Sequence, residues 1–122
     1  MSDINREVCA SRHQPVRDTL EVIGGKWKIL ILAVLLEHPM QFNALSRGIG
    51  ISPRILTREL RDLQINQLVD RTEQDTRPVT VVYTATPHAQ TLAPLITAMS
   101  HWGYLHYEAI SGRRRADDPR PA

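Results

Sequence analysis

The sequence predicts a mainly α-helical fold with one small β-hairpin, an α+β domain, and three observations support it. Apolar residues recur at helical spacing through most of the segment 15–110. The stretch VTVVYTA at 79–85 instead places an apolar residue at every second position, so that Val79, Val81, Tyr83 and Ala85 share one face, as in a strand. The chain has 122 residues, 42% of them hydrophobic, which is enough for one modest core.

The two ends of the chain differ from this domain in composition. Residues 1–14 are polar, and we expect a flexible N-terminal arm. Residues 111–122, SGRRRADDPRPA, are charged and contain proline, which predicts a disordered tail. The N-terminus has no signal-peptide pattern, and the longest apolar run, 29–36, is too short to span a bilayer. We therefore expect a cytoplasmic protein that does not bind membranes.

Two helices open the domain. Pro15 suits the first turn of a helix, and Gly24 and Gly25 end that helix. A second helix at 26–37 contains the run ILILAVLL, which is apolar on all sides. Such a helix is expected in the centre of the domain.

A helix-turn-helix pattern follows. A short helix is predicted at 41–47, and the two glycines of RGIGIS make a turn after it. Ser52 is a good N-cap and Pro53 a good first residue for the next helix, which we expect at 53–67.

A hairpin and a long helix complete the domain. LVDRT and VTVVYTA are typical of paired strands, with the polar tip EQDTRP between them. Thr86 caps and Pro87 opens a last helix at 87–110. A hairpin directly after a helix-turn-helix predicts a winged helix-turn-helix fold.

The helix at 53–67 carries two opposed stripes. At about 100° per residue, Leu56, Leu60 and Leu63 fall on one face and the arginines on the other. An exposed face of arginine and threonine can enter the major groove and read base edges. An ordinary solvated face, with arginines paired to Glu59 and Asp62, is the alternative. The predicted DNA-binding residues of this helix are Ser52, Pro53, Arg54, Thr57, Arg58 and Arg61.

The last helix carries more apolar surface than one small domain can cover. Part of its stripe must pack on the first two helices of the same chain, but the remainder suggests a partner helix and hence a homodimer. Dimerisation suits DNA reading, because paired recognition helices meet successive major grooves about 34 Å apart. The predicted interface residues are Leu92, Leu95, Met99 and Trp102.

Other chemistry has little support in the sequence. Because Cys9 is the single cysteine, an internal disulfide is excluded, and no His or Cys cluster has the spacing of a metal site. No nucleophile, base and orienting residue form a recognisable set, and there is no glycine-rich phosphate loop. We therefore expect neither an enzyme nor a bound cofactor or metal.

Four parts of the chain together resemble the HxlR-type winged helix-turn-helix regulators, relatives of the MarR family. These parts are PVRDTLEVIGGKWKILIL, FNALSRGIGISPRILTRELRDL, QLVDRT, and VVYTATPHA with the later LAPLITAMSHWG, and they span residues 15–103. The resemblance implies a homodimeric bacterial transcription factor with helix 53–67 in the major groove of double-stranded DNA. It also implies a wing at 73–80 that reaches the flanking DNA, with Thr76 and Arg77 as its candidate contacts.

The chain departs from the family pattern at two basic positions. Family members often carry Arg or Lys where Gln41 stands here, and a basic residue near the start of the second strand, where Thr80 stands. Both departures remove phosphate contacts that the resemblance implies. Arg77, Lys26 or Lys28 could compensate, and the candidate phosphate contacts are Lys26, Lys28 and Gln41.

A sensing role for the cysteine is also open. Some family members sense electrophiles or oxidants through a cysteine just before the first helix, commonly followed by proline. Here Gln14 precedes Pro15, and Cys9 lies earlier in the chain. Nearby basic residues such as Arg12 would favour the Cys9 thiolate and Glu7 would oppose it. Cys9 is thus a candidate redox sensor, and a small-molecule or electrophile effector stays open.

A winged-helix module that binds protein instead of DNA is the alternative function. The arginine stripe favours DNA, because a protein-binding version would more often present apolar anchors on that face. Fold analogy alone does not separate the two. The salt dependence of binding does separate them, because the affinity for DNA falls steeply with salt through counterion release, whereas an apolar protein contact does not.

Overall fold

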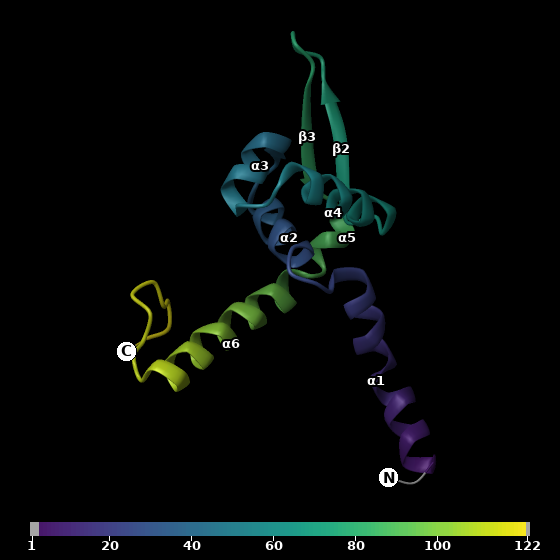
Figure 1. Cartoon of the computed structure of the whole chain (residues 1–122), viewed down its shortest axis with the longest axis vertical. Helices are drawn as coiled ribbons and strands as arrows, with labels where there is room; N and C mark the ends of the chain where they lie inside the picture. Colours follow the sequence, from purple (N-terminus) through teal and green to yellow (C-terminus); the bar gives the residue numbers. More distant parts are fainter. Residues whose placement is uncertain (1–2, 122) are drawn as a thin grey trace.

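The chain forms a small domain from which a hairpin and two helices project (Figure 1). The computed structural model describes the backbone of residues 3–121 and the side chains of residues 12–121. The elements in order are α1 (Asp3–Ile23), α2 (Lys28–Glu37), β1 (Met40–Gln41), α3 (Phe42–Ile49), α4 (Pro53–Ile65), β2 (Val69–Gln74), β3 (Thr80–Ala85), α5 (Pro87–Gln90) and α6 (Ala93–Ser111). The hairpin of β2 and β3 extends from one end, and α1 and α6 diverge from the other (Figure 1). The predicted mainly α-helical fold with a winged helix-turn-helix is confirmed.

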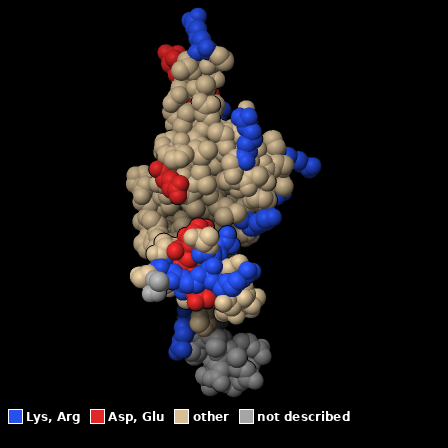
Figure 2. All heavy atoms as spheres, turned by 90° about the vertical axis from the view of Figure 1, so that its left-hand side faces the viewer, with Lys and Arg blue, Asp and Glu red and all other residues tan. Residues whose placement is uncertain are grey.

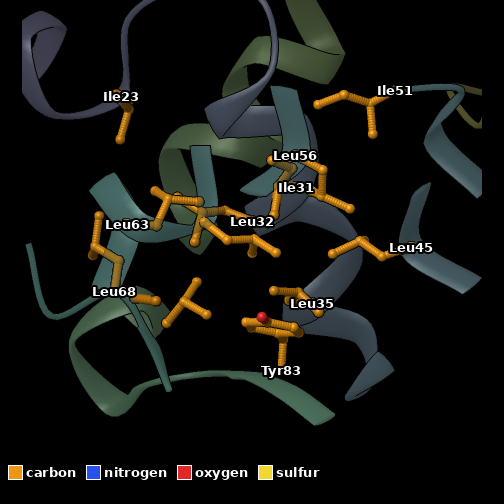
Figure 3. Close-up of a cluster of buried hydrophobic side chains, with 13 residues drawn as sticks. Ile23, Ile31, Leu32, Leu35, Leu45, Ile51, Leu56, Leu63, Leu68 and Tyr83 are labelled. Atoms are coloured by element: carbon orange, nitrogen blue, oxygen red, sulfur yellow. The ribbon is translucent and has the colours of Figure 1, made fainter. Parts of the chain in front are cut away.

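The core is built around α2, as the apolar run of this helix predicts. Ile31 and Leu32 are fully buried and Leu35 nearly so, close to leucines of α4 (Figure 3). The remaining buried hydrophobic side chains come from the surrounding elements and are Ile23, Leu45, Ile51, Leu56, Leu60, Leu63, Leu68, Val69, Tyr83 and Ala89. Among the described side chains, α6 contributes no buried residue.

A short strand that the sequence did not predict joins the hairpin. β1 pairs antiparallel with β3, so the sheet has the order β1-β3-β2. The buried Tyr83 of β3 faces Met40 on one side and Arg71 on the other. Because β1 has only two residues, it leaves no alternating pattern in the sequence.

The helix predicted at 53–67 ends earlier, at Ile65. Gln67 adopts a left-handed backbone conformation with φ of 60°, and the N–H of Leu68 donates to the carbonyl oxygen of Leu63 at 2.9 Å. These two features make a Schellman-type helix end, which turns the chain so that Leu68 enters the core. Glycine usually marks such an end, and glutamine does not, so the sequence carries no clear stop signal here.

The prediction of one long last helix at 87–110 is wrong, because the structure has the short α5 followed by α6. The two helices are separated at Thr91 and Leu92, and Pro94 is the second residue of α6. A proline inside a helix lacks the N–H, and its ring clashes with the carbonyl four residues earlier. Pro94 is accommodated in a first turn, where neither problem arises, so the helix is interrupted before it.

The N-terminal segment also differs from its expectation. α1 begins at Asp3, whereas a flexible arm at 1–14 and a helix start at Pro15 were expected. Residues 1–2 lie outside the described part of the chain. Pro15 lies inside α1, where its missing N–H removes one helical hydrogen bond. Polar side chains do not prevent a helix, since Arg, Glu and Gln are good helix formers.

The C-terminal tail, expected to be disordered, folds back against α6 (Figure 1). Arg120 donates to Glu108 of α6 at 2.5 Å and to Asp118 at 2.6 Å. The hydroxyl of Tyr104 donates to the carbonyl oxygen of Asp117 at 3.2 Å. Figure 2 shows basic and acidic side chains interleaved in one patch at this end of the molecule. The composition of the tail gives the number of charged residues, but it does not show that these residues form ion pairs.

Candidate nucleic-acid interface

The leucine stripe of α4 faces the core, as predicted. Leu56, Leu60 and Leu63 are 0%, 1% and 0% exposed. The arginine and threonine side chains on the other face are exposed, and they are Arg54, Thr57, Arg58 and Arg61. The buried stripe therefore fixes the rotation of α4 about its axis, with the basic face outward.

Ser52 and Pro53 fix the start of α4, as the sequence predicts. The hydroxyl of Ser52 accepts from the N–H of Ile55 at 3.3 Å, and Pro53 is the first helical residue. Such a cap satisfies one of the free N–H groups at a helix start. The positive end of the helix dipole thus lies beside Arg54, which suits an approaching phosphate.

The exposed face of α4 borders an open hollow of about 580 Å³. Its lining residues are Ser52, Arg54, Ile55, Thr57, Arg58 and Arg61. Ile55 is the one lining residue that was not predicted, because an isoleucine beside a leucine stripe is typical of the core. It is half-buried at the edge between the two faces. The Thr57 hydroxyl donates to the carbonyl oxygen of Pro53 at 2.8 Å, which holds its side chain in place.

The predicted phosphate contact at Lys28 is not supported by its surroundings. Its Nζ lies 2.5 Å from a carboxylate oxygen of Glu59 and 3.3 Å from one of Asp62, both on α4. The hydrogen bond to Glu59 raises the pKa of Lys28 above its ordinary value, so this lysine is charged at neutral pH. Its side chain is 15% exposed. Lys28 therefore joins α2 to α4 and does not extend into solvent.

The other two candidate phosphate contacts are exposed. Lys26 lies in the turn before α2, with its Nζ 4.6 Å from the centre of the Trp27 ring. Gln41 is the last residue of β1 and stands at the N-cap position of α3, where its side chain makes no capping hydrogen bond. Both stay predictions, as do the groove-facing residues of α4.

The wing tip is organised by Thr76. Its hydroxyl donates to the carbonyl oxygen of Pro78 at 2.9 Å and lies 2.9 Å from the hydroxyl of Thr80. Arg77 lies between Thr76 and Pro78 in the loop and is exposed. Thr76 therefore shapes the tip through these hydrogen bonds, and Arg77 is the exposed basic residue of the predicted pair.

A second surface lies at the opposite end of the domain. Among the predicted interface residues, Leu92 is half-buried against the core, whereas Leu95, Met99 and Trp102 are 37%, 47% and 63% exposed. The Trp102 ring stacks on His106 at 4.8 Å between centroids.

An apolar hollow of about 430 Å³ separates α1 from α6. Leu20 and Ile23 of α1, Ile29 of α2, and Leu95 and Met99 of α6 line it. The sequence placed apolar residues on both helices, but it could not show that they face one hollow, because they are far apart in the chain.

Cys9 falls within the backbone of α1, but its side chain lies outside the described residues. Its role as a redox sensor stays a prediction. Of the helices in residues 3–121, none combines the length and apolar character needed to cross a membrane.

The chain matches the family model described as HxlR-like helix-turn-helix over residues 22–111. It is 37% identical over 98 residues to YdzF of Bacillus subtilis (strain 168), an uncharacterized HTH-type transcriptional regulator, and the match covers 79% of this chain and 90% of YdzF. It is 36% identical over 105 residues to BH0655 of Halalkalibacterium halodurans, another uncharacterized HTH-type transcriptional regulator, covering 84% of this chain and 93% of BH0655. The structure resembles that of the redox regulator HypR in its reduced form, with a TM-score of 0.74, 33% identity, and coverage of 81% of this chain and 99% of HypR. The chain thus belongs to the HxlR-like helix-turn-helix family and is a DNA-binding transcriptional regulator.

Proposed function

We propose that this regulator binds double-stranded DNA as a homodimer, with α4 in the major groove and the wing on the flanking DNA. The observation that carries this proposal is the division of α4 into a fully buried leucine face and an exposed arginine face beside an open hollow. Arginine reads guanine through paired hydrogen bonds, and threonine contacts either hydrogen-bonding edges or the thymine methyl group. The proposed base-reading residues are Arg54, Thr57, Arg58 and Arg61.

Contacts to the DNA backbone would set the register of α4. Arg77 at the wing tip is exposed and can reach the duplex beside the groove. Lys26 and Gln41 are exposed near the starts of α2 and α3 and are the remaining candidates for phosphate contacts. Such contacts orient the protein on DNA but do not carry sequence information.

The dimer is proposed from the surfaces of α1 and α6. Among the described residues, none of α6 is buried, although its stripe contains Leu95, Met99 and Trp102. On α1, Val16 and Leu20 are 57% and 61% exposed. A contiguous apolar surface of this kind usually marks a protein interface. A second copy of the chain is the occupant that fits best, because a two-fold dimer presents two recognition helices to successive major grooves.

The signal that controls DNA binding is suggested by a structural relative. HypR is named a redox regulator and has been solved in reduced and oxidized forms. For this chain the corresponding proposal has two alternatives, a small-molecule effector or a redox or electrophile signal acting through Cys9, and the response of DNA binding to diamide distinguishes them. The chain would act in the cytoplasm, where an operator is accessible, and without enzymatic activity.

Selection of bound fragments from the source genome, followed by titration at several salt concentrations, tests the proposed function. The selected fragments should share a site with two-fold symmetry, with half-sites about one helical turn apart. The logarithm of the binding constant should fall linearly and steeply with the logarithm of the salt concentration. Binding to no fragment, or binding that does not depend on salt, would instead favour a module that binds protein.

A further inference from the structure

An ionic cluster joins the start of α2 to the side of α4 that does not face DNA. Lys28 is the first residue of α2, and its Nζ donates to Oε2 of Glu59 at 2.5 Å. The same Nζ lies 3.3 Å from Oδ2 of Asp62, one turn further along α4. The two carboxylates therefore share one lysine.

Glu59 is the member of the cluster that most needs a cation. Its side chain is 11% exposed, whereas that of Asp62 is 46% exposed. A carboxylate that has lost most of its water must be paired or hydrogen-bonded to stay charged. Lys28 supplies that pairing through Oε2.

The other oxygen of Glu59 points toward the DNA-reading face. Oε1 of Glu59 lies 3.7 Å from a terminal guanidinium nitrogen of Arg58, whose side chain is 70% exposed. At that distance Arg58 is attracted without a close hydrogen bond. Without Lys28, Arg58 would be the remaining cation within 4 Å of the Glu59 carboxylate among the described residues. A closer Arg58–Glu59 pair would draw the guanidinium away from the groove.

We propose that Lys28 is a positioning residue for DNA recognition: by pairing with Glu59 it leaves Arg58 extended on the reading face of α4. This inference rests on the proposed function, because Arg58 has a base to read only if α4 lies in the major groove. Lys28 itself touches no DNA in this arrangement. It acts on sequence preference from the opposite side of the recognition helix.

The test compares variants of the full chain on the selected operator and on operators changed at single base pairs. Arg58→Ala first identifies the base pair whose preference depends on Arg58. Lys28→Met should reduce the preference at that same base pair by about tenfold. A tenfold change corresponds to about 1.4 kcal/mol, which lies within the discrimination of about 1–3 kcal/mol that one bidentate contact gives. Lys28→Met combined with Glu59→Gln should restore the preference to within about twofold, because a neutral amide no longer attracts Arg58. Lys28→Arg, which keeps the charge, should retain the preference.

The competing role, a direct phosphate contact by Lys28, gives a different pattern. Lys28→Met would then weaken binding equally on all operators, Glu59→Gln would not rescue it, and the salt slope would fall by about one. That pattern overturns the proposal, as does an unchanged preference in Lys28→Met. Asp62→Asn is the control within the cluster, since it leaves the Lys28–Glu59 bond in place and should keep the preference.

Loss of folding is separated from loss of positioning by a second variant. Lys28→Gln keeps a hydrogen-bond donor for Glu59 but removes the charge, and it should show the same loss and the same rescue as Lys28→Met. Thermal unfolding of each variant establishes that it is folded at the binding temperature. Failure of the wild type to bind a specific site would refute the proposed function itself. Specific wild-type binding without the rescue pattern would refute only the role of Lys28.

Discussion

The guanidinium of Arg120 donates to the carboxylate of Glu108 at 2.5 Å and so ties the C-terminus of the chain to α6. The same guanidinium lies 2.6 Å from Asp118, whose side chain is 2% exposed. Hydrogen bonds from Arg120 and Arg114 hold the pKa of Asp118 well below its ordinary range. The tail is thus held to α6 by charges that acid can remove.

Lowering the pH should therefore release the tail. Because the pKa of Asp118 is lower in the folded than in the unfolded state, its stabilising contribution is complete above the unfolded-state pKa of about 4 and is lost as the pH falls toward the folded-state pKa. Backbone ¹⁵N relaxation should show residues 114–120 ordered at neutral pH and increasingly mobile below about pH 4. Asp118→Asn should make them mobile already at neutral pH. A tail equally ordered in the variant and the wild type would argue against the ion-paired arrangement.

The buried face of α4 should dominate the stability of the domain. Leu60 is 1% exposed, so Leu60→Ala should lower the free energy of unfolding by about 2–5 kcal/mol through lost burial and a residual cavity. Ile65 on the same helix is 71% exposed, and Ile65→Ala should change it by less than about 0.5 kcal/mol. Urea denaturation of both variants measures the difference. Equal losses of unfolding free energy in the two variants would mean that the leucine stripe does not pack α4 against the core.

The dimer should be sensitive to a charge on the free face of α6. Met99 is 47% exposed, and Met99→Asp would bring two like charges together in a symmetric interface. The dimer should then dissociate and DNA affinity should fall, although the arginines of α4 are unchanged. Sedimentation velocity at micromolar concentration tests this, with Thr97→Asp on the face toward the tail as the control.

Two results of the Met99 experiment would revise the model. A monomeric wild type would remove the dimer altogether. A variant that unfolds instead of dissociating would place Met99 in the core of one chain and leave the interface elsewhere.

Cys9→Ser should leave DNA binding in reducing buffer intact. Since Cys9 is the only cysteine, oxidation can join it only to another chain or to a small thiol. We expect diamide to alter wild-type binding only weakly, as measured by a DNA-binding titration before and after treatment. Strong release by diamide that disappears in the serine variant would identify Cys9 as a sensor.

The features that the sequence predicted are those encoded by local periodicity. The opposed stripes of α4 recur every three or four residues, so the sequence alone places Leu60 and Arg58 on opposite faces. The link between Lys28 and Glu59 spans 31 residues, and no local pattern announces it. The sequence therefore offers Lys28 as a phosphate contact that could replace the missing basic residues, whereas its pairing with Glu59 does not support that role.

The features that were missed arise where local signals are weak or conflict. Ala89, Leu92 and Ile96 keep a helical spacing across the break, and this continuity conceals the interruption that Pro94 imposes between α5 and α6. The strand β1 is too short to show a period, and it is defined by its pairing with Tyr83 far along the chain. The tail was judged by composition, whereas its order comes from specific pairs such as Arg120 with Glu108.

Whether the arginine face of α4 reads base edges is decided by the base preference of Arg58→Ala. Affinity should be measured on the selected operator and on every single-base variant of one half-site, with Arg113→Ala in the tail as a control that removes the same charge far from α4. Arg58→Ala should cost about 1–3 kcal/mol of binding free energy on the operator and relax the preference at one base pair per half-site, while Arg113→Ala should keep the full preference. If Arg58→Ala kept the wild-type base preference at every position, Arg58 would not be a base-reading residue of α4.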